Sequence, residues 1–420
     1  MPTPDSHIRG GLTPRWASFG FTFVNSLGTG IVTNGIFFLT RQSYAFAEWK
    51  NYLLAVLLGL TYVVGALAAG PAVAWLRRRF PGLSTRTVLL GTMVLMAAPC
   101  TLPTVGAWLD GAGPRSEWPA WALILLYSPL AGVLWPLVES YISGGRRGAD
   151  LRGTIGWWNV VWSSALVLVF WGVAPLVERH ALLAVLLLGG AHMGATVFLA
   201  AFAREPAPHA ETSHEPHPPV YGRLLVAFRL LLPMSYVVSS ALGPYLPGAM
   251  DRMGVAAGWQ TVVASAWLLP RVMMFIALRL WSGWHGRWGL AVVGGVALLA
   301  GFAVCVLANR VASGDAAVGV LLGGLALFGL GMAMIYTGAI YYAMEVGQAE
   351  VAAGGKHEAL IGAGYTVGPV CGLAASVAVE GGVLEPDRFE PLVLGAVGLI
   401  SIVLAGMVAR RVAGARTTGA

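Results

Sequence analysis

Apolar runs of about 20 residues, separated by short polar segments, extend along almost the whole chain. A helix of about 20 residues is long enough to cross the hydrocarbon core of a bilayer. Lipid offers the backbone no hydrogen-bond partners, so such a segment must satisfy its own N–H and C=O groups, as a helix does. Only 11% of the 420 residues are charged, against roughly 25% in soluble domains. The sequence therefore predicts an all-α integral membrane protein.

These apolar runs predict twelve membrane spans. The start of the chain, MPTPDSHIRGGLTPRW, lacks the basic, apolar and small-residue order of a cleaved signal peptide, so we expect the first span to be retained. The predicted spans lie near residues 17–40, 51–76, 87–108, 119–142, 153–177, 181–203, 223–247, 259–281, 289–309, 316–342, 358–380 and 391–410.

Basic residues are distributed unevenly between the segments that join these spans. With the N-terminus inside, about 17 of the 26 Lys and Arg residues fall in cytoplasmic segments. This bias predicts a multi-pass protein of the cytoplasmic (inner) membrane with both termini in the cytoplasm. The net charge of +7 reflects this topology. Because no soluble segment carries a basic stripe with stacking aromatics, we expect no nucleic-acid partner.

One polar stretch, AREPAPHAETSHEPHPPVYGR at residues 203–223, has no helical period and is rich in Pro, Glu and His. We interpret it as a flexible cytoplasmic linker. It divides the chain into an N-terminal six-helix bundle (1–203), a linker (204–222) and a C-terminal six-helix bundle (223–420). Its histidines (His209, His214 and His217) could bind a metal, but a solvated linker is the favoured interpretation. The three cysteines form no CxxC pair, and we predict neither a metal nor a cofactor.

The two halves contain similar sequence features at corresponding positions. The fourth span ends in WPLVESYISGG and the tenth in IYYAMEVG, which places Glu139 and Glu345 at equivalent inner helix ends. Each glutamate is followed by a glycine-containing loop, a basic residue (Arg152 or Lys356) and an Ile-Gly pair. Internal repeats of membrane helices are typical of transporters, whose site is expected near mid-membrane where the repeats meet.

On these features the sequence resembles the major facilitator superfamily over nearly its whole length. The segments after the second and eighth spans are similar to the loop motif of that family. GPAVAWLRRR, residues 70–79, keeps the first glycine and the last arginines, and HGR, residues 285–287, keeps the end of the second copy. The resemblance implies two pseudo-symmetric six-helix bundles around a central cavity, with transport by alternating access. We expect a monomer that binds a small-molecule substrate within the lipid bilayer.

The eleventh span contains GYTVGPVCG, residues 364–372. This pattern is similar to the motif that antiporters of the superfamily carry on the fifth span, where this chain has GWWNVVWSSA instead. One interpretation is antiport. The favoured one is structural, since small residues permit close helix packing and proline bends a helix.

Polar residues inside the spans are the candidates for substrate binding. Arg271 lies about midway along the eighth span, where a permanently charged guanidinium needs a wet cavity or a partner. Asn25 and Thr29 share one face of the first span, by their four-residue spacing. Tyrosine and tryptophan offer flat apolar walls with one polar group each. The complete predicted set is Asn25, Thr29, Tyr62, Trp158, Asn159, Tyr236, Arg271, Tyr336 and Tyr365.

Charged residues at the inner helix ends are candidates for a cytoplasmic gate. We expect Glu139 and Glu345 to pair with arginines of neighbouring loops, in contacts that form in one state and break in the other. The predicted gating set is Arg78, Glu139, Arg152, Arg287 and Glu345. No carboxylate lies at the middle of a predicted span, which leaves a coupling proton or ion undetermined. His192, in the sixth span, is interpreted as a buried packing residue.

Together these features predict a secondary active transporter for a small polar or amphipathic organic molecule, acting as an exporter of a metabolite or toxic compound. Import of a sugar or an organic anion is the alternative within this class. A polytopic membrane enzyme and a ligand sensor that does not transport are alternatives of other classes. The sequence contains no HExxH, GxSxG or GxxxxGK[ST] motif, and we predict that the protein is not an enzyme.

Overall fold

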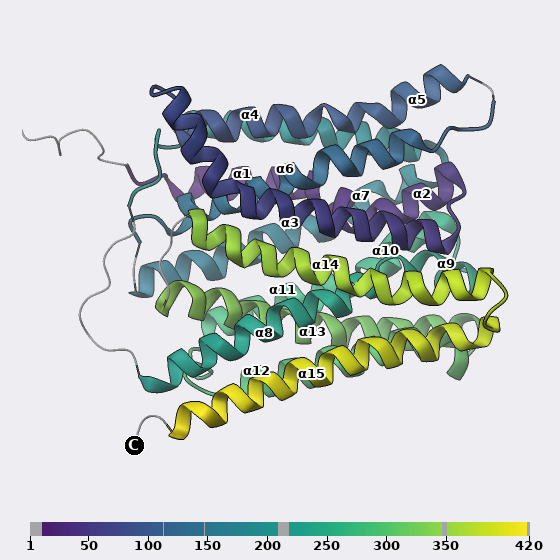
Figure 1. The fold of residues 1–420 in the computed structure, drawn as a ribbon. Coiled ribbons are helices and arrows are strands. Elements are labelled where there is room, and N and C mark those ends of the chain that lie inside the picture. Colours follow the sequence, from purple (N-terminus) through teal and green to yellow (C-terminus); the bar gives the residue numbers. More distant parts are fainter. Residues whose placement is uncertain (1–10, 112, 147, 209–217, 347–350, 418–420) are drawn as a thin grey trace, which may run out of the picture.

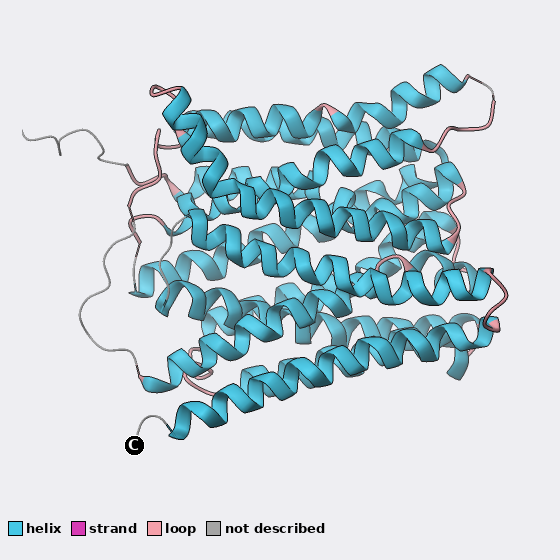
Figure 2. Cartoon of the chain, viewed as in Figure 1, coloured by secondary structure: helices cyan, strands magenta, loops and turns pink. Residues whose placement is uncertain are grey.

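The computed structural model describes residues 11–111, 113–146, 148–208, 218–346 and 351–417, and these residues form helices and loops without strands (Figures 1 and 2). The N-terminal half contains α1 (Arg15–Gly30), η2 (Ile31–Gly35), α2 (Ile36–Tyr44), α3 (Glu48–Arg79), α4 (Thr85–Ala97), η3 (Pro99–Thr101), α5 (Leu102–Asp110), α6 (Trp118–Ser143), α7 (Gly148–Ala195) and η4 (Thr196–Ala201). The C-terminal half contains α8 (Pro219–Leu242), α9 (Tyr245–Arg252), α10 (Ala257–Ala264), η5 (Ser265–Trp267), α11 (Leu268–Leu280), α12 (Gly289–Val311), α13 (Gly314–Val346), α14 (Val351–Glu380), η6 (Pro386–Arg388) and α15 (Phe389–Thr417).

Within the described residues, 11 helical segments are long and apolar enough to cross a membrane. One of them, Gly148–Ala201, has 54 residues and a non-helical residue, His180, inside it. Gly28 lies against His192 and Gly30 against Leu166, although 26 residues of straight helix would separate those two partners by about 39 Å. The chain therefore folds back at His180, and this segment holds the fifth and sixth predicted spans. Each of the twelve predicted spans coincides with a helical stretch.

The first span is interrupted by a π-helical turn, η2, at the sequence IVTNG. Thr33 Oγ1 donates to the Thr29 carbonyl at 2.6 Å and Asn34 Nδ2 donates to Thr33 Oγ1 at 2.8 Å, so side chains bond locally where the helix widens. Such turns are rare and occur mostly at functional sites. Here the turn lies beside the central cavity described below.

The two halves meet along long helix pairs. α3 packs lengthwise on α14, and α7 packs on α11 and α10. Figure 1 shows the early helices on one side of the bundle and the late helices on the other, with α14 next to α3. Glycine makes this approach possible, because a Cβ on Gly355 would lie 2.6 Å from the Ala66 carbonyl oxygen. The halves are thus joined through small residues.

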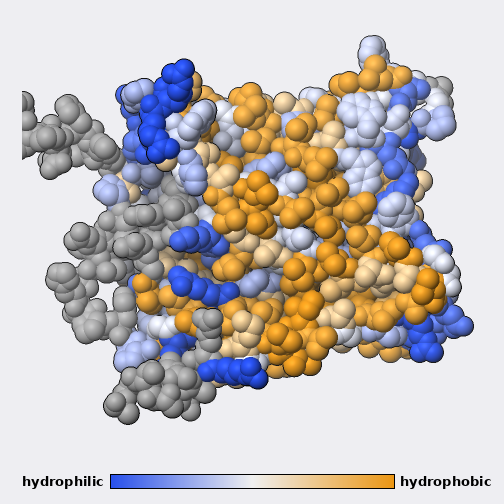
Figure 3. Space-filling view, in the orientation of Figure 1, coloured by the Kyte–Doolittle hydropathy of each residue, from blue (hydrophilic) through white to orange (hydrophobic). Residues whose placement is uncertain are grey.

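The outer surface carries a broad apolar belt between two polar ends (Figure 3). Exposed Leu60, Leu126, Leu168 and Ile402 belong to the large apolar side chains that no protein element covers. The first described residues and the end of α15 lie at the same end of the bundle, which we call the terminal face (Figure 1). The other end, which contains α9 and residues 44–48, is called the opposite face.

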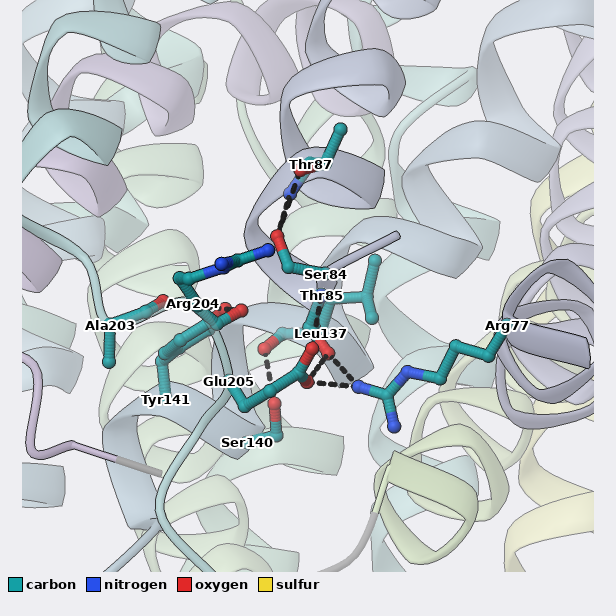
Figure 4. A network of polar contacts seen from close by, with 10 residues as sticks. All are labelled: Arg77, Ser84, Thr85, Thr87, Leu137, Ser140, Tyr141, Ala203, Arg204 and Glu205. Atoms are coloured by element: carbon teal, nitrogen blue, oxygen red, sulfur yellow. Dashed lines mark hydrogen bonds and ion pairs between the residues drawn. The ribbon is translucent and has the colours of Figure 1, made fainter. Parts of the chain in front are cut away.

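The predicted linker is ordered at both ends. Glu205 accepts from Thr85 Oγ1 at 2.5 Å and also binds Arg77, in the network of Figure 4. Tyr141 donates to the carbonyl oxygens of Ala203 and Arg204, each at 3.2 Å. α8 begins at Pro219. The linker histidines His209, His214 and His217 lie outside the described residues.

Helix packing inside the C-terminal half predicts a sharp difference between two glycines of α12. A Cβ on Gly301 would lie 2.7 Å from the Gly324 carbonyl oxygen and the Phe328 Cα of α13, whereas a Cβ on Gly295 meets nothing within 4 Å. Gly301→Leu should destabilise the protein by about 1–3 kcal/mol or more through overpacking, and Gly295→Leu should be neutral. Thermal unfolding of the two purified variants in detergent checks this. Equal melting temperatures would contradict the packing of α12 on α13.

Candidate functional site

A central cavity of about 720 Å³ lies between the two halves. Its walls come from α1, η2, α3, α6 and α7 of the N-terminal half and from α8, η5, α11, α13 and α14 of the C-terminal half. The structure brings seven of the nine predicted substrate-binding residues to this cavity: Thr29, Tyr62, Trp158, Tyr236, Arg271, Tyr336 and Tyr365.

Arg271 is the cation of this cavity. Its side chain is 2% exposed, and its Cζ lies 4.3 Å from the ring centroid of Trp162 and 5.1 Å from that of Trp267. Nε and Nη2 have no hydrogen-bond partner, and none of the ion pairs among the described residues contains Arg271. A desolvated cation–π contact is worth about 2 kcal/mol. The aromatic rings thus help to offset the buried charge and leave two donors free.

Aromatic rings form most of the remaining wall. Tyr365 lies 5.1 Å from Tyr236 and 5.9 Å from Tyr62, measured between ring centroids. Trp162 lies 5.5 Å from Tyr336 in an edge-to-face arrangement. A flat apolar group fits between such walls, while the hydroxyls offer hydrogen bonds.

Several residues of the cavity wall were not predicted from the sequence. Two of them, Trp162 and Trp267, could have been found from their helical spacing to predicted residues. Trp162 follows Trp158 by four residues, and Trp267 precedes Arg271 by four, so each pair shares a helix face. The other missed residues include Trp135, Met332, Asn34 and Glu358. The sequence does not show which faces of their helices line the cavity, because that depends on how the helices pack.

The prediction that Asn25 lines the cavity is wrong. Asn25 is fully buried inside the N-terminal half, where its Oδ1 lies 2.8 Å from His192 Nδ1. The Tyr127 hydroxyl lies 2.8 Å from His192 Nε2. The polar face of the first span is therefore divided: Asn25 holds α1 against α7, and Thr29 faces the cavity.

Asn159 also lies outside the central cavity. It accepts from Trp162 Nε1 at 3.2 Å and lines a second cavity, of about 850 Å³, near the terminal face. Arg152 and His285 line this second cavity as well. Asn159 therefore orients the Trp162 ring, which lies over Arg271. Asn159 itself lines the cavity near the terminal face.

Two buried carboxyl groups meet at one edge of the central cavity. Glu139 and Glu358 are 5% and 4% exposed, and their carboxyl groups are neighbours. The Tyr62 hydroxyl donates to Glu358. Carboxyl oxygens of both glutamates and an imidazole nitrogen of His357 all lie within 4.8 Å of one another.

These positions correct two expectations for the carboxylates. Glu139 was expected to pair with a loop arginine, yet no ion pair among the described residues includes it. The eleventh span was expected to begin at residue 358, but α14 already begins at Val351, so Glu358 lies two turns inside the helix. The start of this helix was predicted seven residues too late, so the sequence did not reveal that Glu358 lies inside it.

At the terminal face, Arg152 Nη1 of α7 lies 3.4 Å from Glu345 Oε1 of α13, which links the two halves. His285 stacks on Tyr341, with ring centroids 4.6 Å apart, and burial together with the Arg152 charge lowers the pKa of His285. Arg78 and Arg287 are exposed and form no ion pair among the described residues. Of the predicted gating arginines, the structure pairs Arg152 alone with a predicted glutamate.

The opposite face carries a further set of ion pairs that sequence analysis did not predict. Arg41 Nε of α2 lies 2.5 Å from Asp251 Oδ2 of α9. Arg252 lies 4.0 Å from Glu48 of α3 and 3.6 Å from Glu390 of α15. The Arg41–Asp251 and Arg252–Glu48 contacts connect the N-terminal and C-terminal halves at the end of the bundle far from Arg152, whereas Arg252–Glu390 lies within the C-terminal half.

No family model and no curated protein matches this sequence. Solved structures match it over most of its length. The human organic anion transporter MFSD10 (TETRAN) is 14% identical, with 93% of this chain and 98% of that chain covered and a TM-score of 0.59. The nucleoside transporter NupG is 13% identical, with coverages of 94% and 98% and a TM-score of 0.63. The POT family transporter PepTSo is 14% identical, with coverages of 95% and 97% and a TM-score of 0.64.

This chain has the fold of the major facilitator transporters. The central cavity, the Arg41–Asp251 pair and the Arg152–Glu345 pair all lie where the two halves of this fold meet. The three matched structures are transporters, and none of them is an enzyme.

The ion pair at the opposite face leads to a prediction about access to the cavity. Arg41→Gln removes a contact between the halves, so a cysteine placed at Asn34, which faces the cavity, should react faster with an impermeant maleimide. The increase should reach at most about fivefold, because a partly exposed pair contributes up to about 1 kcal/mol.

Arg388→Gln is the matched control for this experiment. Arg388 lies in η6, is 66% exposed and pairs only with its neighbour Asp387, so its loss should not change the labelling rate. The same protein without a cysteine at position 34 gives the background from Cys100, Cys305 and Cys371. An equal rate in Arg41→Gln and Arg388→Gln would show that the Arg41–Asp251 pair does not restrict access.

Proposed function

We propose that this protein is a secondary active transporter for a small amphipathic organic molecule that carries an anionic or strongly hydrogen-bond-accepting group. The observation that carries the proposal is Arg271: a buried guanidinium with two unpartnered donors, at the wall of a cavity between the two halves. A charge held at this depth without a carboxylate is costly, and an anionic group of a substrate would complete its coordination.

The aromatic walls support an amphipathic substrate. Rings of Trp162, Trp267 and Tyr336 surround the guanidinium, so a planar apolar body could stack while its anionic group binds Arg271. The matched structures include an organic anion transporter and a nucleoside transporter. Among these substrates, an organic anion accords best with a cavity whose cation is unpaired.

Movement of one half against the other is the proposed transport step, with residues 1–203 and 223–420 as two pseudo-symmetric bundles. The Arg152–Glu345 pair and the Arg41–Asp251 pair connect the halves at opposite ends. Alternating access requires that such contacts break at one end while they hold at the other. We therefore assign these pairs to the gates of the two faces.

We further propose that the terminal face is cytoplasmic in an inner membrane and that the direction is export. Arg77, Arg78, Arg79 and Arg86 all lie at this face, as the positive-inside rule requires of a cytoplasmic side. The glycine motif of α14 supports antiport less strongly than it supports packing. A Cβ on Gly364 would lie 2.5 Å from the Tyr236 Cβ of α8.

Ligand binding by Arg271 can be measured directly. A thermal-shift screen of organic anions, neutral analogues and cations should raise the melting temperature of the wild type with one class, the anions. In Arg271→Gln the same ligand should bind about 10- to 100-fold more weakly, because a hydrogen bond to a charged group contributes about 1.5–3 kcal/mol. Arg179→Gln, at an exposed arginine of α7, is the matched control and should bind like the wild type.

Flux separates transport from binding alone. Proteoliposomes loaded with the labelled ligand should release it, and Arg271→Gln should release it at the rate of empty liposomes. Binding without flux would identify a ligand sensor, and chemical conversion of the ligand would identify an enzyme. An unchanged thermal shift in Arg271→Gln would refute the assignment of the cavity cation.

A further inference from the structure

The structure places the Glu139–Glu358 carboxyl pair across the boundary between the two halves. Glu139 belongs to α6 and Glu358 to α14. α14 approaches α6 closely because residue 354 is glycine: a Cβ there would lie 2.9 Å from Glu139 Oε2 and 3.3 Å from the Pro136 Cα. The sequence thus provides a close contact between helices at the one place where the two carboxyl groups meet.

The carboxyl oxygens of Glu139 and Glu358 lie within 4.8 Å of each other. Two carboxyl groups can attract each other at this range only through a shared proton, because two ionised carboxylates offer only acceptors. Both groups are buried, and none of the ion pairs among the described residues includes either of them. Oε1 of Glu139 has no hydrogen-bond partner in the described part of the chain. Two adjacent carboxylates in a low-dielectric site repel each other strongly, so one of them holds a proton while the helices stay together.

The groups around the pair do not replace this proton. Tyr62 of α3 already donates to Glu358, and His357 of α14 lies beside the pair with its Nε2 unpartnered. Tyr236, Tyr336 and Tyr365 face Glu358 from α8, α13 and α14, and Arg271 of α11 lies beyond these tyrosines. The Arg271 guanidinium lies over the Trp162 ring, and no ion pair among the described residues joins it to either carboxylate.

We propose that the Glu139–Glu358 pair is a proton-binding latch between the two halves: the protonated pair holds α6 against α14, and release of the proton drives these helices apart. The latch couples proton uptake to closure of the two halves. It rests on the proposed function, because it requires that the two halves move relative to each other. Since Glu358 also lines the central cavity, the proton site and the substrate site share a wall. By linkage, a ligand bound there changes the proton affinity, and the proton changes the ligand affinity equally.

The experiment measures opening of the halves without any substrate. A cysteine replaces Thr337, whose side chain lines the second cavity near the terminal face, and its rate of reaction with an impermeant reagent is measured from about pH 5 to pH 9, with rates corrected for the intrinsic ionisation of the thiol. In the wild-type background the corrected rate should rise about tenfold or more as the pair loses its proton.

Glu139→Gln and Glu358→Gln remove this dependence if the latch exists. A glutamine amide donates to the remaining carboxylate without needing a proton, so both variants should stay closed at every pH. Glu178→Gln, at an exposed glutamate of α7, is the matched control and should keep the wild-type profile. Thermal unfolding of each variant confirms that it is folded, and if one glutamine variant fails to fold the other provides the test.

Three results would overturn the latch. They are a wild-type rate independent of pH, a glutamine variant with the wild-type profile, and a rate at fixed pH that responds to Zn²⁺ or to a chelator, which would make the cluster a metal site. Because no ligand is added, absence of substrate flux together with a pH-dependent rate would refute the proposed transport and leave the latch standing. Substrate flux together with a cysteine reaction rate that does not depend on pH would refute the latch and leave the proposed transport standing.

Discussion

Burying an ionisable side chain costs free energy unless it is paired or hydrogen-bonded, and the interior of this protein is arranged around the few such groups that it contains. Arg271 meets this cost with aromatic rings, the nearest of which is Trp162 at 4.3 Å. The carboxyl groups of Glu139 and Glu358 lie next to each other, and Glu358 also accepts a hydrogen bond from Tyr62. In both cases the compensation is incomplete, since Arg271 and Glu139 retain unpartnered atoms. These are the atoms to which we assign ligand and proton chemistry.

Polar groups that bond to one another inside one half have a different role. His192 lies between Asn25 and Tyr127, 2.8 Å from each, and all three are buried within the N-terminal half. Both ring nitrogens of His192 have partners, and the three side chains together fix the position of α1 against its neighbours, away from the central cavity. The contrast between His192 and Arg271 shows why burial of a polar residue in a membrane span does not by itself identify a binding site.

The boundary between the halves carries the features that transport requires. Glycines at positions 59 and 355 bring α3 and α14 together through backbone contact, which needs no polar bond and can slide. Charged contacts hold the halves at both faces, through Arg152–Glu345 and Arg41–Asp251. The cavity, the carboxyl pair and the gates all lie on this one boundary, so a single relative movement of the halves would change all of them.

The sequence by itself determined the membrane helices, because about 20 apolar residues without charge have no other stable arrangement in lipid. It also indicated Arg271, whose cost at mid-span does not depend on its neighbours. Only the tertiary structure decided that Thr29 faces the cavity while Asn25, one turn away, faces His192. It alone brought Glu139 to Glu358, 219 residues later in the chain. Helical periodicity specifies which residues share a face, but which faces meet is set by packing between distant helices.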